Sequence, residues 1–203
     1  MKVLIACEFS GIVRDAFKAK GHDAWSCDLL PTERQGQHIQ DDVRNHLKGG
    51  WDLMIGHPPC TFLCNSGVSW LYKQPSRMLE LSLATQFFYV LWNASIPRIC
   101  IENPIPHKYG RLPKHSHIIQ PWMFGHPEQK ATCLWLKGLP KLKPTNNVKE
   151  QMLKLPDNKR QRLHYLPPSK DRQTIRSRTF QGIANAMAEQ WGTTARADEN
   201  KGA

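Results

Sequence analysis

Short strand-like segments alternate with helical segments along most of this chain, and that alternation constrains the fold most strongly. Segments 3–7, 22–28, 51–55, 98–101 and 132–136 have the length and apolar content of strands, whereas 11–20, 76–93 and 181–191 read as helices. This pattern is typical of an α/β fold with a doubly wound, mostly parallel sheet. The 203 residues suit one such domain.

Residues 138–178 interrupt the alternation, with five prolines and little periodicity. They predict a short, loop-rich insertion between a core at 1–137 and a last helix at 179–192 that completes the core; a disordered tail is expected at 193–203. The insertion carries eleven Lys and Arg against three acidic residues, a local charge of +8 in a chain of net charge +11.

This concentration of charge favours a polyanionic partner, most commonly nucleic acid, although a merely soluble basic protein stays open as an alternative. The residues expected to contact nucleic acid are Lys159, Arg160, Arg162, Lys170, Arg172, Arg176 and Arg178.

No apolar run approaches the roughly 20 residues that span a bilayer. The first apolar run stops at Glu8, so it predicts a strand rather than a signal peptide, and we expect a cytoplasmic protein. The six cysteines include no Cys-x-x-Cys pair. Cys60 and Cys64, with His57 nearby, could hold a metal ion, but no second pair completes a tetrahedral site, and we expect no metal.

A cysteine follows the apolar run 53–55 within the sequence Gly-His-Pro-Pro-Cys, from Gly56 to Cys60. Open α/β sheets bind their ligands at the carboxyl ends of strands, where this thiol is expected. The two prolines restrict the turn, and a thiol held rigidly at such a site indicates a nucleophile.

Other chemically useful side chains follow neighbouring strands. Asp28 ends the second strand and could accept hydrogen bonds from ribose, or could be an exposed turn residue. Asp42 could meet an adenine amino group or cap a helix, and Glu102 could donate a proton or form a salt bridge at the end of its strand. A cysteine and a carboxyl group facing a planar heterocycle suit covalent activation of a pyrimidine.

The order of these residues resembles that of the DNA (cytosine-5) methyltransferases. The family's Pro-Cys motif is similar to Pro59-Cys60, with Cys64 and Gly67 at its serine and glycine positions, and its Glu-Asn-Val motif is similar to Glu102-Asn103. The resemblance runs from residue 3 to 191. Its remaining parts are the loop Phe9-Ser10-Gly11, Asp28-Leu29, Asp42-Val43, the segment from Gly125 to Thr132, and Ala184 to Met187.

The resemblance implies a Rossmann-like class I methyltransferase fold, S-adenosylmethionine as cofactor and methyl transfer to C5 of cytosine in DNA. Cys60 would attack C6, Glu102 would protonate N3, Asn103 would orient Glu102, and Lys130 would stand near the base or the thiolate. Such an enzyme flips its base out of a duplex or uses single strands. The cofactor residues implied are Phe9, Ser10, Gly11, Asp28, Leu29, Asp42, Val43, Pro59 and Asn185.

The chain departs from the family at four places. Val13 and Arg14 replace the further glycines of the first loop, and Glu128, Lys130 and Thr132 replace a glutamine and two arginines. Pro104 after Asn103 removes a backbone donor, and about forty residues stand in place of a large target-recognition domain. A short target is therefore expected, with Phe62, Trp70, Tyr72 and Tyr165 as candidate stacking residues.

Four alternatives stay open: a methyltransferase for RNA, one for a free pyrimidine nucleotide, an inactive relative that binds nucleic acid, and an unrelated cysteine hydrolase. A short methyltransferase of this kind would suit a phage or another mobile element.

Overall fold

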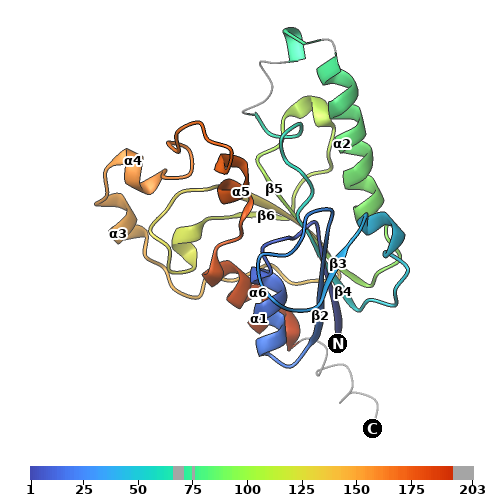
Figure 1. Cartoon of the computed structure of the whole chain (residues 1–203). Coiled ribbons are helices and arrows are strands. Elements are labelled where there is room, and N and C mark those ends of the chain that lie inside the picture. The colour runs from blue at the N-terminus through green and yellow to red at the C-terminus, as the bar shows by residue number, and fades with distance from the viewer. Residues whose placement is uncertain (66–70, 75, 194–203) are drawn as a thin grey trace.

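Seven described strands form one sheet at the centre of the molecule (Figure 1). The computed structural model describes residues 1–65, 71–74 and 76–193. The strand order is β3-β2-β1-β4-β5-β7-β6. β7 runs antiparallel to both of its neighbours, β5 and β6, and the other described strand pairs are parallel. The strands are β1 Lys2–Ala6, β2 Asp23–Asp28, β3 His38–Gln40, β4 Leu53–Gly56, β5 Arg98–Pro104, β6 His117–Ile119 and β7 Thr132–Lys137.

Helices cover both faces of this sheet, because the central strands are apolar on both sides. Val3 and Ile5 of β1 join a core with helices α1 and α6, whereas Leu4 and Ala6 join the opposite core with α2. The helices are α1 Ile12–Ala19, α2 Ser76–Trp92, α3 Lys149–Leu153, α4 Asp157–Arg160, α5 Arg172–Ser177 and α6 Gln181–Gly192, with 3-10 turns η1 Val43–Asn45, η3 Lys108–Gly110 and η4 Pro121–Met123.

The sheet confirms the predicted α/β class, and its mixed, mostly parallel order is consistent with a Rossmann-like methyltransferase fold. Two details differ from the sequence prediction. Neither β3 nor β6 is among the strands that the sequence pattern predicts. Both strands have only three residues, too few for a period-2 pattern to stand out. Of the predicted tail, residues 194–203 lie outside the described part of the chain.

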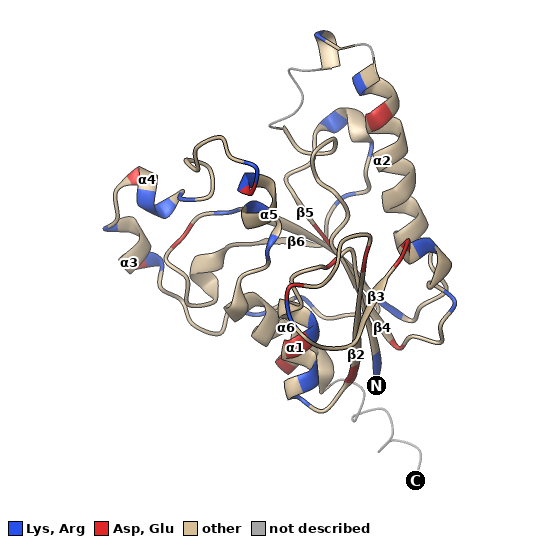
Figure 2. Cartoon of the chain, in the orientation of Figure 1, with Lys and Arg blue, Asp and Glu red and all other residues tan. Residues whose placement is uncertain are grey.

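The basic insertion at 138–178 is not wholly loop. It contains α3, α4 and α5, three helices of four to six residues that lie to one side of the sheet (Figure 1). Lys and Arg recur along α4, α5 and the segments around them (Figure 2). No helix in the described part of the chain is both long enough and apolar enough to cross a lipid bilayer.

A fully buried arginine joins α1 to the loop after β2. The guanidinium of Arg14 donates hydrogen bonds of 3.1–3.2 Å to the hydroxyls of Ser26 and Thr32 and to the carbonyl oxygens of Arg34 and Gln35. A buried charge is tolerated only when it is paired and hydrogen-bonded, and these acceptors, with the Asp15 carboxylate 2.8 Å from Nε, meet that condition.

Replacing this arginine tests its structural role. Arg14→Met keeps the length of the side chain but removes the donor from the buried Ser26 hydroxyl and from three part-buried acceptors, so it should lower the free energy of unfolding by roughly 2–4 kcal/mol. Urea titration followed by circular dichroism measures the change. Lys18→Met, at an exposed position of the same helix, is the control and should change it by less than about 0.5 kcal/mol. Equal effects of the two variants would refute the account.

Candidate active site

The parallel register of three central strands brings the predicted catalytic groups to one edge of the sheet. Gly56, the last residue of β4, pairs with Ala6 of β1 on one side and with Ile101 of β5 on the other. Extending this register by one residue places His57 level with Glu102. The turn to Cys60 also begins directly after Gly56. β2 and β4 lie on opposite sides of β1, so the strand order reverses between β1 and β4, and ligands bind at such a point in open α/β sheets.

A cleft of about 970 Å³ opens at this edge, between the strand ends and the basic insertion. Its walls include three of the predicted catalytic residues, Cys60, Glu102 and Lys130, which come from three separate parts of the sequence. The predicted cofactor residue Pro59 also lines the cleft. The insertion contributes Lys170, Arg172 and Arg176 among the residues predicted to contact nucleic acid.

The Cys60 thiol is neutral in the resting site. A hydrogen bond with the side chain of Cys64 and burial raise the pKa of Cys60 well above its usual range, and the charge of Lys130 only partly opposes them. The cause is local, since the turn places Cys64 beside Cys60 and the Cys64 backbone N–H donates to the Cys60 carbonyl at 3.0 Å.

Glu102 is paired with His57, a residue that the sequence suggested only as a possible metal ligand. His57 Nδ1 lies 3.1 Å from Glu102 Oε2, and both side chains are almost buried. Burial would raise the pKa of Glu102, but the contact with His57 and the charges of His57 and Lys130 outweigh it, so the pKa is lowered. The same contact overcomes the effect of burial on His57 and raises its pKa.

Of the two roles that the sequence left open for Glu102, the structure shows the salt bridge at the end of its strand, with His57 as the partner, and proton donation stays a prediction. The position of His57 next to a strand end was a visible feature of the sequence. Its contact with Glu102 depends on the strand register, which the sequence does not reveal directly.

Asn103 and Lys130 occupy different environments. Asn103 is buried on β5, and its Nδ2 donates to the carbonyl of Pro104 at 2.7 Å. Adjacent residues of a strand point to opposite faces, so its predicted role of orienting Glu102 stays a prediction. Lys130 lies on the cleft wall, where its Nζ donates to the carbonyl of Arg176 at 3.0 Å and so ties the core to the insertion.

The predicted nucleic-acid residues divide into two groups. Outside the cleft lining, Arg160 pairs with Asp157, Arg162 with Glu128 at 3.0 Å and Arg178 with Glu33, and Lys159 is exposed on α4. Those that line the cleft are Lys170, Arg172 and Arg176. The cleft-lining group has no ion pair with a carboxylate among the described contacts, so its charge is available at the mouth of the site.

Two of the implied cofactor residues, Asp28 and Leu29, are adjacent at the end of β2. Leu29 is 70% exposed, an apolar surface beside the Asp28 carboxyl group, whose pKa is raised by burial. Asp28 Oδ1 accepts a 2.9 Å hydrogen bond from the Leu30 backbone. Asp42 caps η1 and is bound by the side chain of Arg44, which lowers the Asp42 pKa, and Val43 behind it is buried.

The loop after β1 is organised by its own side chains. The Glu8 carboxylate accepts hydrogen bonds from the backbone N–H groups of Val13 and Arg14 at 2.7 and 3.2 Å, and the Ser10 hydroxyl also donates to it. Gly11 has φ +70°, and a Cβ there would lie 2.5 Å from the Arg14 guanidinium. In place of further glycines, this chain therefore fills the space around Gly11 with Arg14.

The other residues implied for the cofactor are dispersed. Phe9 is half-buried in the loop after β1. Asn185 is exposed on α6, where its Oδ1 accepts a 2.9 Å hydrogen bond from Gln181, and it does not line the cleft.

The candidate stacking residues are also dispersed. Tyr72 and Tyr165 are 77% and 55% exposed, and the hydroxyl of Tyr72 is hydrogen-bonded to that of Tyr109 at 2.9 Å. The ring of Phe62 is covered by the guanidinium of Arg77 at 4.3 Å. Gly67 and Trp70 lie outside the described residues.

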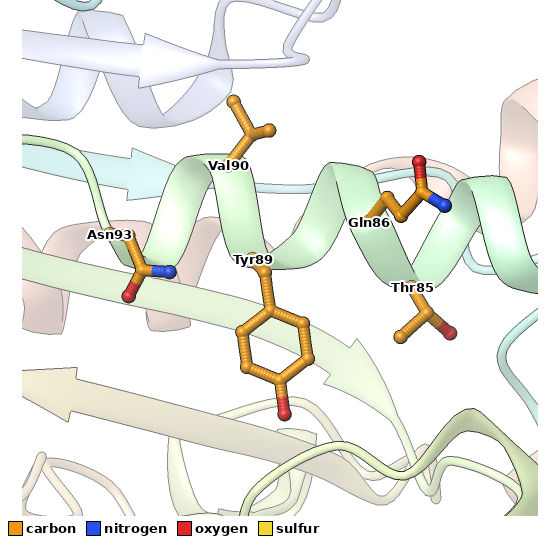
Figure 3. Close-up of a pocket in the computed structure, with 5 residues that line it drawn as sticks. All are labelled: Thr85, Gln86, Tyr89, Val90 and Asn93. Carbon is orange, nitrogen blue, oxygen red and sulfur yellow. The ribbon is translucent and has the colours of Figure 1, made fainter.

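A second depression, of about 390 Å³, lies on the outside of α2, and Figure 3 shows the five residues that line it. Its polar side chains include Thr85 and Tyr89, whose hydroxyls donate to the carbonyls of Gly110 and Arg111. It offers no thiol, carboxylate or cation, so it does not compete with the cleft as a catalytic site. In the described part of the chain, no three His, Cys, Asp or Glu side chains are placed to hold a metal ion.

Among the solved structures that are similar to this chain is one from E. coli. No family model matches the chain, and no curated protein matches it. The structure is that of an E. coli protein described as a provisional DNA modification methyltransferase encoded within a prophage. It has 19% identity and a TM-score of 0.45 over 77% of the present chain, which spans just over half, 56%, of that protein's length.

Proposed function

We propose that this protein is an S-adenosylmethionine-dependent methyltransferase that methylates C5 of cytosine in DNA through a covalent bond to Cys60. The observation that carries the proposal is the convergence of Cys60, Glu102 and Lys130 on one cleft. A sulfur nucleophile, a carboxyl group and a cation are the three groups needed to activate a pyrimidine ring by addition at C6.

Each group has a defined part in the addition. Sulfur of Cys60 bonds to C6, N3 gains a proton from Glu102, and the electron density gained at C5 makes that carbon nucleophilic. The thiol loses its proton as the bond forms, and the charge of Lys130, which lowers the Cys60 pKa, favours this loss. After methyl transfer, the C5 proton leaves, N3 returns its proton, the bond from sulfur to C6 breaks and the sulfur takes up a proton again.

The cofactor, when bound, supplies an electrophilic methyl group. Asp28 and the exposed Leu29 would hold its ribose and adenine at the end of β2, and Pro59 would stand between this position and the cleft. The remaining residues proposed to contribute are Phe9, Ser10, Gly11, Asp42, Val43 and Asn185.

The choice of DNA rests on charge. The cleft is lined by Lys130, Lys170, Arg172 and Arg176, with Glu102 as its carboxylate, and Lys and Arg continue over the insertion (Figure 2). Such a surface neutralises phosphates without reading sequence. A target base would enter the cleft from a single strand or after flipping from a duplex.

Methyl transfer from labelled S-adenosylmethionine tests the proposal. We expect label at C5 of cytosine in single-stranded or duplex DNA, and a loss of at least about 10³-fold in rate for Cys60→Ser, because a serine hydroxyl is a far weaker nucleophile. Cys133→Ser changes a buried thiol away from the cleft and serves as the control, with its fold checked by circular dichroism.

The substrate panel also contains RNA and dCMP. Transfer only to RNA or only to dCMP would replace DNA as the substrate, and DNA binding without any transfer would indicate an inactive relative. Undiminished transfer by Cys60→Ser would exclude the covalent mechanism.

The division of the basic residues predicts two kinds of charge variant. Lys170→Gln and Arg176→Gln should each weaken binding to single-stranded DNA and lower the slope of log K against log salt by about 0.7. Arg162→Gln and Arg178→Gln should have smaller effects, because Glu128 and Glu33 already offset those charges. Fluorescence anisotropy from about 50 to 200 mM salt measures the slopes. Equal slopes for all four variants would contradict the assignment of the cleft as the binding face.

A further inference from the structure

His57 and Glu102 form an isolated acid–base pair at the inner end of the cleft. The register places them side by side, His57 Nδ1 lies 3.1 Å from Glu102 Oε2, and the exposed fractions of their side chains are 12% and 11%. Both residues line the cleft that holds Cys60. His57 Nε2 has no hydrogen-bond partner among the described residues, and Glu102 Oε2 has none there besides its 3.1 Å contact with His57 Nδ1. Buried polar atoms without partners are rare, and they are expected where a ligand or a transferred proton completes the site.

The surroundings of the pair come from several elements. Glu8, in the loop after β1, and Asp28, at the end of β2, add negative charge near His57, and Lys130, before β7, adds positive charge near both members of the pair. The titratable thiols that sense the Glu102 charge are Cys60 and Cys100.

We propose that His57 and Glu102 share one proton and act as a coupled donor, in which His57 is the positioning residue that supplies Glu102 with the proton destined for N3 of the base. The sharing of the proton rests on the geometry alone, and its use at N3 rests on the proposed function. A carboxylate beside an imidazolium is the same one-proton state as a carboxylic acid beside a neutral imidazole.

The proton balance of the addition follows from this arrangement. The bond from Cys60 sulfur to C6 forms, and the thiol proton leaves to solvent. The proton on His57 Nδ1 passes to Glu102 and from there to N3, so the pair ends without its proton and the base carries one. When the methylated product is released, the C5 proton leaves to solvent, the bond from sulfur to C6 breaks, and the sulfur keeps the electron pair of that bond and takes a proton from solvent. N3 returns its proton to Glu102 and His57, so the site regains its neutral thiol and its one-proton pair.

The electrostatics support a pair that keeps one proton at neutral pH. The pKa of Glu102 is lowered and that of His57 is raised, because each stabilises the charged form of the other against the effect of burial. Between the two values the pair holds one proton. Above the His57 pKa it holds none, so proton donation to N3 should fail on the alkaline side.

Nuclear magnetic resonance titration of the His57 imidazole tests the shared proton without requiring activity. In the wild-type chain, His57 should titrate above its ordinary pKa. In Glu102→Gln it should titrate below it, because burial and Lys130 remain while the carboxylate is lost. The same pKa in both chains would overturn the pair. This result stands whether or not the chain transfers methyl groups.

The pH dependence of kcat/KM for methyl transfer tests the use of the proton. His57→Asn keeps a polar side chain but cannot titrate, so its alkaline limb should move to lower pH and part of the lost rate should return on acidification. A merely structural loss would lower the whole profile without shifting it, and that result would overturn the role of His57. His115→Asn, outside the cleft, is the matched control and should keep the wild-type profile.

The two measurements separate the claims. A shifted imidazole titration together with no methyl transfer to any substrate would reject the proposed function while upholding the shared proton. Normal methyl transfer with an unshifted profile in His57→Asn would uphold the function and reject the proton relay.

Discussion

The pairing of β4 with β1 and β5 is the constraint on which the proposed site depends. These strands are buried on both faces, so their backbone groups must be satisfied by the ladder itself. A slip of one residue would carry every side chain of a strand to the opposite face. The register Gly56–Ile101 therefore fixes both the contact of His57 with Glu102 and the start of the turn to Cys60.

The charges of the cleft follow from this placement. A buried carboxylate is costly, and here it has one partner from the next strand and a second cation, Lys130, from the segment before β7. The Cys60 thiol shows the opposite balance, because the hydrogen bond with Cys64 and burial raise its pKa by more than the charge of Lys130 lowers it. The resting site thus combines a neutral sulfur with a paired acid. In the proposed function, both would change protonation state when a base enters.

The insertion completes the cleft rather than forming a separate unit. Lys130 Nζ reaches the carbonyl of Arg176, and Gln129 N–H donates to the carbonyl of Arg160 at 2.6 Å. These contacts hold the basic helices over the strand ends. In the proposed function, the base and its flanking phosphates would therefore be bound by adjoining walls of one cleft.

Sequence patterns predicted the class of fold and the main elements, because runs such as 53–55 and 76–93 are long enough to show their character. They missed β3, β6 and α3 to α5, which have only three to six residues each. Strand-end reasoning placed Cys60 and Glu102 at one edge of the sheet, and the family resemblance named Lys130. All three line one cleft, and their catalytic roles stay predictions. It could not find the pairing of His57 with Glu102 or the effect of Cys64 on Cys60, since both depend on atomic contacts set by register and turn geometry.

The central claim is that Cys60 bonds to C6 of a cytosine, and trapping with a DNA oligonucleotide that contains 5-fluorocytosine tests it most directly. Fluorine at C5 leaves no proton to remove after methyl transfer, so the adduct should persist. Peptide mass mapping after incubation with S-adenosylmethionine should find the methylated fluorocytosine on Cys60 and no adduct in Cys60→Ser. Attachment to another cysteine, or no adduct from a chain that methylates ordinary cytosine, would contradict the account.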